Sequence, residues 1–291
     1  MDYGICLPNF PDGASREGME AAAETAERLG WSTVWTTDHV LVPTADAGDY
    51  GRIYDAILSL AWVGARYAKV RLGTSVIVVP QRNAVILAKE LATLDALTSG
   101  RVIAGVGIGW NKGEFRNLGV PERFHVRGAY LDETIALWRH LWSGSTEPFH
   151  GRFHSFDDFA FGPLPHQGAA LPIVVGGRAE AALRRAGRLG DGYHSSATSS
   201  AKYADRVPII RAAAEAAGRP IPWLTVRAWV EFDASGGRHF SIRGTPDEMA
   251  GEIKAFAALG VEHIGLWFKS TEPDELVRLV ERFQREVAPL V

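Results

Sequence analysis

The sequence contains one cysteine, Cys6, among 291 residues. One thiol can form neither an intramolecular disulfide nor a cysteine cluster for a metal ion, which is typical of proteins in a reducing cytoplasm. The sequence also has no apolar run that approaches the about 20 residues of a membrane-spanning helix. Residues 1–7 lack the basic region of a signal peptide. We therefore expect a cytoplasmic protein that does not associate with membranes.

The chain has little excess charge of either sign. Its 31 Lys and Arg residues against 34 Asp and Glu residues give a formal net charge of −3 at pH 7. No strong field therefore favours nucleic acid or anionic lipid. The sequence also lacks His and Cys residues at zinc-ligand spacing, a Gly-x-Ser-x-Gly elbow and a phosphate loop that ends in Gly-Lys-Ser or Gly-Lys-Thr. We expect no nucleic-acid partner and no metal site.

Hydrophobic residues make up 46% of the chain and charged residues 22%, which is typical of a globular protein. Short apolar segments alternate with helical patterns, and several are continuous hydrophobic runs, as in parallel strands covered on both faces. These segments are residues 3–7, 33–37, 70–78, 102–106, 172–176, 192–195, 225–232 and 263–268. Eight such units without a linker predict a single α/β domain over residues 1–291, a (β/α)8 TIM barrel. A doubly wound open sheet is the alternative.

Three predicted helices have clear sequence signals at their ends. Ser15 precedes an amphipathic segment that stops at Gly30, and Asn83 precedes a second one. The stretch Thr245-Pro246-Asp247-Glu248 combines an N-cap, a proline in the first turn and an acid three residues after the cap. These signals predict helices between the strands, as a barrel requires.

The interval between the fourth and fifth predicted strands is longer than the others. It contains a predicted helix at 122–142 and then an aromatic, proline-rich segment at 153–165, which indicates a β-hairpin or a lid. We expect the ligand pocket to be roofed by residues 110–116, 153–161 and the loop 233–240.

Polar residues follow several of the predicted strands. Asp38 and His39 come after the second strand, and Trp110, Asn111 and Glu114 come after the fourth. In a (β/α)8 barrel the loops after the strands form the active site, so we expect these side chains to lie at one rim. Each also has a simpler interpretation, as a helix cap, a partner for buried backbone or a surface group.

Two glycine-rich stretches also follow strands. Gly176-Gly177 precedes a helical pattern, where free backbone N–H groups can bind an anion; a tight turn is the alternative. Gly105-Val106-Gly107-Ile108-Gly109 lacks the spacing of the dinucleotide fingerprint, which excludes a Rossmann interpretation.

Six short motifs together resemble the luciferase-like flavin- and F420-dependent oxidoreductases, in the expected order and over nearly the whole chain. They lie at residues 36–39, 72–76, 101–110, 172–177, 190–193 and 244–248. The Thr-Asp-His form at 37–39 is more similar to the F420 branch, because flavin monooxygenases more often have Glu at the position of Asp38. The resemblance therefore implies coenzyme F420, with FMN as the alternative.

The resemblance also implies which residues bind the cofactor. Asp38 would hydrogen-bond the ring, a non-prolyl cis peptide at Ser75-Val76 would lie against its back face, and the backbone at Gly176-Gly177 would hold its phosphate. The expected cofactor-binding residues are Asp38, Ser75, Val76, Gly107, Gly109, Trp110, Asn111, Gly176, Gly177 and Arg178.

The implied activity is hydride transfer between the deazaflavin and an unidentified small-molecule substrate. We expect His39 to give or take the proton. Related sugar-phosphate dehydrogenases have a Glu, thought to be catalytic, where Trp110 stands here, and Glu114 is the nearest replacement. The resemblance further implies a homodimer. Three alternatives remain: an FMN-dependent monooxygenase, a non-catalytic barrel that binds a flavin or another phosphorylated ligand, and an aldolase- or isomerase-like barrel with Lys269 as the Schiff base.

Overall fold

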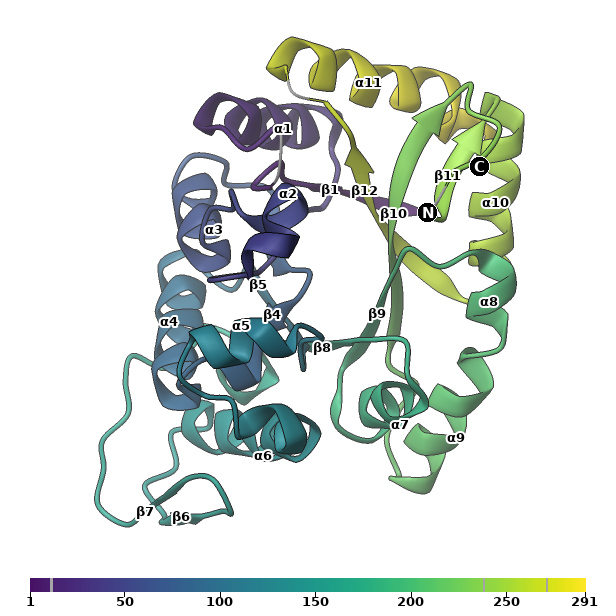
Figure 1. Ribbon diagram of the computed structural model, residues 1–291. Coiled ribbons are helices and arrows are strands. Elements are labelled where there is room, and N and C mark those ends of the chain that lie inside the picture. The colour runs from purple at the N-terminus through teal and green to yellow at the C-terminus, as the bar shows by residue number, and fades with distance from the viewer. Residues whose placement is uncertain (11–12, 238, 271) are drawn as a thin grey trace.

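The computed structural model describes residues 1–10, 13–237, 239–270 and 272–291. Eight parallel strands form a closed barrel, because β9 pairs with β10 and so joins the two ends of the strand order into a ring (Figure 1). In ring order the strands are β1 (Asp2–Cys6), β2 (Thr33–Thr36), β3 (Arg71–Thr74), β5 (Val102–Gly107), β8 (Ile173–Gly176), β9 (Gly192–Ser196), β10 (Trp223–Phe232) and β12 (Val261–Phe268). Closure confirms the predicted barrel and excludes the open sheet.

Helices surround the barrel. The longer ones are α1 (Arg16–Leu29), α3 (Ala56–Gly64), α4 (Ala84–Leu97), α6 (Arg123–Trp142), α7 (Glu180–Leu189), α9 (Val207–Ala216), α10 (Pro246–Ala258) and α11 (Pro273–Glu286). The shorter ones are α2 (Ala47–Tyr50), α5 (Lys112–Asn117), α8 (Ser200–Ala204) and the 3-10 turns η1 (Thr44–Asp46), η2 (Val79–Gln81), η3 (Gly168–Ala170) and η4 (Ala288–Leu290). Within the described ranges, no helix is long and apolar enough to cross a membrane.

The three predicted helix starts are confirmed. The Ser15 hydroxyl accepts a hydrogen bond from the Gly18 N–H at the start of α1, and the Asn83 side chain accepts from the first turn of α4. Thr245 and Glu248 form the predicted reciprocal capping box of α10. These caps satisfy N–H groups that have no partner inside the helix.

The structure departs from the predicted strands in two places. The strand predicted at 70–78 is split into β3 and β4 (Ile77–Val78), and the peptide bond between Ser75 and Val76 in the gap is cis, as the resemblance implied. A further strand, β11 (Ser241–Gly244), pairs with β10 outside the ring, and the sequence did not indicate it. Its four residues are too few to show a periodic pattern.

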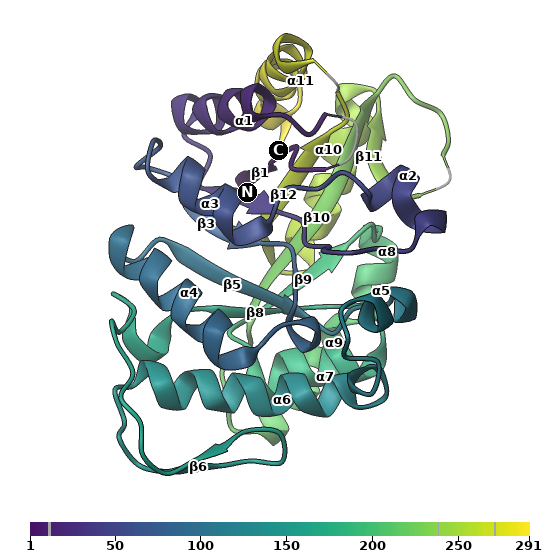
Figure 2. The same cartoon turned by 60° about the vertical axis from the view of Figure 1, so that its left-hand side comes forward.

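The long interval between β5 and β8 contains a hairpin, β6 (Phe149–His150) and β7 (Ser155–Phe156), which begins before the predicted range of 153–165 and overlaps it only in part. It lies against the outer side of α6 (Figure 2), where the Glu133 carboxylate accepts hydrogen bonds from the Arg152 and Phe153 N–H groups. The Phe153 ring packs 5.3 Å from that of Tyr130. This segment is therefore held on the outer layer of the barrel.

Trp35, which points inward from β2, fills the centre of the barrel and is fully buried. It fits because three neighbouring strands present glycine there: a Cβ on Gly4, Gly73 or Gly265 would lie 2.9, 2.4 or 3.1 Å from the indole. The indole Nε1 donates to His263 Nε2 at 3.0 Å. The barrel interior is thus built around one large side chain whose polar atom is satisfied.

We predict that Gly73→Ala lowers the free energy of unfolding by about 1–3 kcal/mol, because the added methyl overpacks a filled core. Its Cβ would lie 2.4 Å from Trp35 Cε3. The control is Gly251→Ala in α10, where nothing lies within 4 Å of the new Cβ, so stability should be unchanged or slightly higher. Urea unfolding of both variants checks this. An unchanged midpoint for Gly73→Ala would contradict the packing.

Candidate functional site

A cavity of about 530 Å³ opens at the carboxyl ends of the barrel strands. Most of the predicted site residues line it, although they come from four different regions of the sequence. They are Asp38, His39, Ser75, Val76, Gly107, Gly109, Trp110, Gly176, Gly177 and Arg178. Asn111 and Glu114 are not on its wall. A volume of this size is in the usual range for a small-molecule site.

The Asp38 carboxylate fixes the segment that follows the cis peptide. Its Oδ2 accepts a hydrogen bond from the Val78 N–H at 2.9 Å, and its Oδ1 accepts from Arg82 Nη2 at 2.7 Å. Arg82 also donates to Asp55 at 3.1 Å. Burial favours the uncharged form of Arg82, but the two carboxylates outweigh it and raise its pKa. Asp38 therefore has two protein partners in addition to its place on the cavity wall.

His39 lines the cavity and is held from behind by Glu114. The distance between His39 Nδ1 and Glu114 Oε2 is 2.9 Å, and the same carboxylate accepts from the Val40 N–H and the Gln81 side chain. Burial raises the pKa of Glu114, but these hydrogen bonds prevail and lower it, so the group is ionised. A carboxylate can only accept, so Nδ1 carries the hydrogen and Nε2 has no partner among the described residues. Gln81 was not among the predicted site residues.

The predicted roof is correct in part. Trp110 is 57% exposed and lies edge-on to His39 at the cavity mouth, with ring centroids 6.0 Å apart. His39 also packs against Tyr50 of α2, which was not predicted, and His239 of the loop after β10 lines the cavity. The expectation for residues 153–161 is wrong, because the hairpin packs on α6 and none of these residues lines the cavity.

The placement of Asn111 corrects its predicted role as a cofactor ligand. Its side-chain oxygen caps α5 by accepting from the Gly113 and Glu114 N–H groups, and its amide donates to Asp46 at 2.8 Å. The capping alternative considered for rim residues therefore holds for Asn111. By starting α5 at this point, the cap also directs Glu114 inward to His39.

Glycines shape one wall of the cavity around Val76. A Cβ on Gly107 would lie 2.6 Å from Val76 Cγ2, and one on Gly176 would lie 2.9 Å from Val76 Cγ1. The next residue, Gly177, has φ +131°, which favours glycine, and it leads into α7. The N-cap residue of α7, Ala179, offers no side-chain hydrogen bond, and none from another described residue reaches the first turn of this helix. Its first N–H groups therefore remain available to an anion.

A set of inward-facing polar residues is connected to the cavity wall. Ser75 and Arg227 line the cavity, and His194 and Thr225 lie behind them. Thr225 donates to the Tyr193 carbonyl at 3.1 Å, so it accepts from His194 Nδ1 at 2.6 Å. His194 Nε2 then accepts from the Ser75 hydroxyl at 2.8 Å. Burial, with the charges of His263 and Arg227, lowers the pKa of His194 to about 3. This imidazole is neutral at physiological pH.

Several cavity residues were not among the predicted site residues, including Phe10, Arg227 and Trp229. For Arg227 and Trp229, which lie on β10, the alternation of residues along the strand indicates the direction of the side chain. On this strand the inward residues alternate with Val226, Ala228 and other apolar residues that face the helices. Trp229 lines the cavity, whereas Trp267 lies beneath it against Phe10, at a centroid distance of 4.8 Å.

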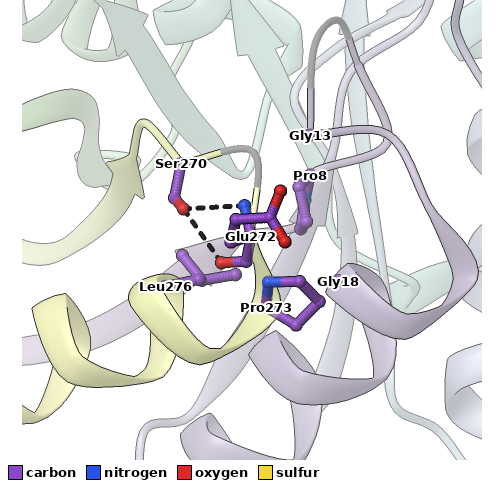
Figure 3. Close-up of a pocket in the computed structure, with 7 residues that line it drawn as sticks. All are labelled: Pro8, Gly13, Gly18, Ser270, Glu272, Pro273 and Leu276. Atoms are coloured by element: carbon purple, nitrogen blue, oxygen red, sulfur yellow. Dashed lines mark hydrogen bonds between the residues drawn. The ribbon is translucent and has the colours of Figure 1, made fainter.

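A second, smaller hollow lies between the loop after β1 and the start of α11 (Figure 3). Pro8, Gly18 and Leu276 surround it, and Ser270 Oγ accepts a hydrogen bond from the Glu272 N–H at 3.0 Å. The space for a water-sized molecule is about 0 Å³. It is a packing contact and not a ligand site. The described residues also contain no group of three or more His, Cys, Asp or Glu side chains that could hold a metal ion.

Comparison with known proteins places the chain beside enzymes of one family. Residues 1–232 match the family model described as luciferase-like monooxygenase. A protein of Mycolicibacterium fortuitum described as F420-dependent glucose-6-phosphate dehydrogenase is 32% identical over 298 residues, which cover 93% of this chain and 85% of that protein.

Solved structures agree with this family at the level of the fold. The coenzyme F420-dependent tetrahydromethanopterin reductase from Methanopyrus kandleri superposes with a TM-score of 0.81 at 18% identity, covering 99% of this chain and 98% of the other. An F420-dependent secondary alcohol dehydrogenase in complex with an F420–acetone adduct also has a TM-score of 0.81, at 20% identity and with 100% and 98% coverage. At such identities the likeness establishes the fold alone.

The buried state of His194 predicts a pH dependence of stability. The unfolded chain binds a proton at this residue near pH 6.5, whereas the folded protein binds it only near pH 3. Stability should therefore fall as the pH drops below about 6.5, by about 1.4 kcal/mol per pH unit from this group. Urea unfolding between about pH 7 and 5 measures the slope. In His194→Gln this contribution of about 1.4 kcal/mol per pH unit should be lost, so the free energy of unfolding should depend less steeply on pH. An equal slope in the variant and the wild type would contradict the assignment.

Proposed function

This chain belongs to the luciferase-like monooxygenase family, and we propose that it is an F420-dependent oxidoreductase acting on a small organic substrate. The main support for the proposal is that His39 and the glycine-lined start of α7 line the same cavity. The named relative of M. fortuitum, at 32% identity over most of both chains, supports the choice of cofactor.

The residues of this cavity fit a deazaflavin with a phosphorylated tail. Val76, packed between Gly107 and Gly176, presents an apolar surface for a flat ring, because side chains at either glycine would collide with it. The uncapped N–H groups of α7, with Gly177 and the exposed Arg178, would hold the phosphate. When bound, F420 would supply two-electron hydride chemistry; the protein supplies binding, orientation and proton transfer.

His39 is the residue we assign to proton transfer. Its Nδ1–H is fixed by Glu114, so Nε2 is the atom that can accept a proton from a substrate hydroxyl or return it to a carbonyl. Glu114 does not reach the cavity and therefore has a positioning role: it selects the tautomer and fixes the orientation of the ring. Asp38 orients the Val78 backbone and Arg82 at the edge of the same wall.

Titration with F420 and FMN, followed by quenching of tryptophan fluorescence, tests the cofactor. We expect F420 to bind at least about tenfold more tightly than FMN, a difference of about 1.4 kcal/mol. The reverse preference would move the chain to the flavin monooxygenase branch. Binding of neither cofactor would overturn the proposed function.

Substitution of His39 and Glu114 tests the proton transfer. With the substrate found in an anaerobic screen, His39→Gln should lower kcat by about a hundredfold or more, the usual contribution of a general acid or base. Glu114→Gln should lower kcat less, because the imidazole remains in place. F420 affinity, measured by the same titration, should stay close to that of the wild type in both variants. An unchanged kcat in His39→Gln would remove this residue from the reaction.

A further inference from the structure

Arg227 places a buried positive charge in the wall of the cavity. It points inward from β10 and is only 6% exposed. Its Nη1 donates to Thr37 Oγ1 at 2.8 Å and to the Ser75 carbonyl at 3.1 Å. Within the described part of the chain, Nε has no acceptor and the guanidinium has no carboxylate partner. A buried cation in this state is costly unless a ligand or solvent balances it.

The surrounding side chains do not supply that balance. The Arg227 guanidinium carbon lies 5.3 Å from the Phe10 ring centroid and 5.5 Å from that of Trp267. Aromatic faces attract a cation, but they do not replace an anion. The nearby carboxylates have other partners, since Asp38 pairs with Arg82 and Glu114 holds His39. The positive charge of Arg227 is therefore available to interact with a ligand in the cavity.

The rest of this part of the wall is aromatic. Phe10, Tyr50, Trp110 and Trp229 line the same cavity as Arg227. Such a wall favours an apolar or aromatic body, and the guanidinium favours an oxyanion at one end of it. Arg227 comes from β10 and is buried, whereas the start of α7 and the exposed Arg178, which we assign to the cofactor phosphate, follow β8.

We propose that Arg227 binds a carboxylate of the substrate, so that the substrates of this enzyme are small organic acids with an apolar or aromatic body. This inference rests on the proposed function, since it concerns the substrate of the same cavity. The carboxylate would neutralise Arg227, and the body of the acid would pack against the aromatic wall. Arg227 would thereby determine substrate specificity without taking part in proton transfer.

Matched pairs of acids and amides test the proposal on the whole protein. Benzoate is compared with benzamide, and phenylacetate with phenylacetamide, by calorimetric titration with and without F420. The two members of a pair have similar shape and differ in charge. We expect the wild type to bind each acid at least about tenfold more tightly than its amide, the usual range for a charge-assisted hydrogen bond. Equal affinities, or no binding of the acids, would overturn the proposal without the need for a variant.

Three variants locate the effect. Arg227→Gln should abolish the preference for the acid, while F420 still binds, because the Gln amide remains a donor for the Ser75 carbonyl. Arg227→Lys, which keeps the charge but loses the planar fork, should retain part of the preference. Arg178→Gln removes the same charge from the exposed rim and should keep the full preference while weakening F420 binding. A preference for the acid that survives Arg227→Gln contradicts the proposal.

The cofactor titration separates this result from the proposed function. If Arg227→Gln loses F420 affinity and keeps the preference for acids, Arg227 faces the cofactor and the substrate assignment is wrong. If the wild type binds no F420 but distinguishes acids from amides through Arg227, the proposed function fails and the anion site remains.

Discussion

The packing of Trp35 in the barrel centre is the constraint on which the site depends. Its indole occupies the space left by Gly4, Gly73 and Gly265, and its Nε1 donates to His263. The other face of the ring stacks on His194 at a centroid distance of 4.6 Å. The position of Trp35 thereby sets the height and tilt of His194, and through its hydrogen bond that of Ser75. Ser75 is part of the cavity wall. The packing of Trp35 in the core therefore helps to determine where a ligand can lie.

Much of the fold could be predicted from the sequence, because a parallel strand covered on both faces appears as a continuous apolar run. The caps at Ser15, Asn83 and Thr245 could also be predicted, since capping depends on residues within one helical turn. The split of the strand at 70–78 could not be predicted, because β4 pairs with β5, which lies further along the chain. The short β11 could not be predicted because its four residues show no periodic pattern. The position of the hairpin likewise depends on Glu133, which precedes it by about twenty residues.

The predicted site residues that directly follow strands line one cavity, because the fold brings all strand ends to one rim. Prediction failed for residues whose direction is set by a local turn or by the partner strand. Asn111 had the expected position, but its side chain caps α5. Glu114 was expected either in the site or in solvent, and it lies in neither place, because it is buried beneath His39. Arg227 lies within a strand, where a charged residue is easily taken for an edge or surface position.

Histidine and arginine respond differently to burial in this barrel, and this difference gives the two residue types different roles in the cavity. Imidazole is close enough to neutrality to lose its proton when buried, and His194 does so, with its pKa lowered to about 3. A guanidinium cannot escape burial in this way, so Arg227 keeps its charge. The interior therefore contains a neutral histidine that only orders hydroxyl groups and an arginine whose charge does not vary with pH. His39, at the mouth beside the ionised Glu114, is left as the imidazole that can exchange a proton with a ligand. Charge recognition and proton transfer are thus assigned to separate groups by the chemistry of each base and by its hydrogen-bond partners.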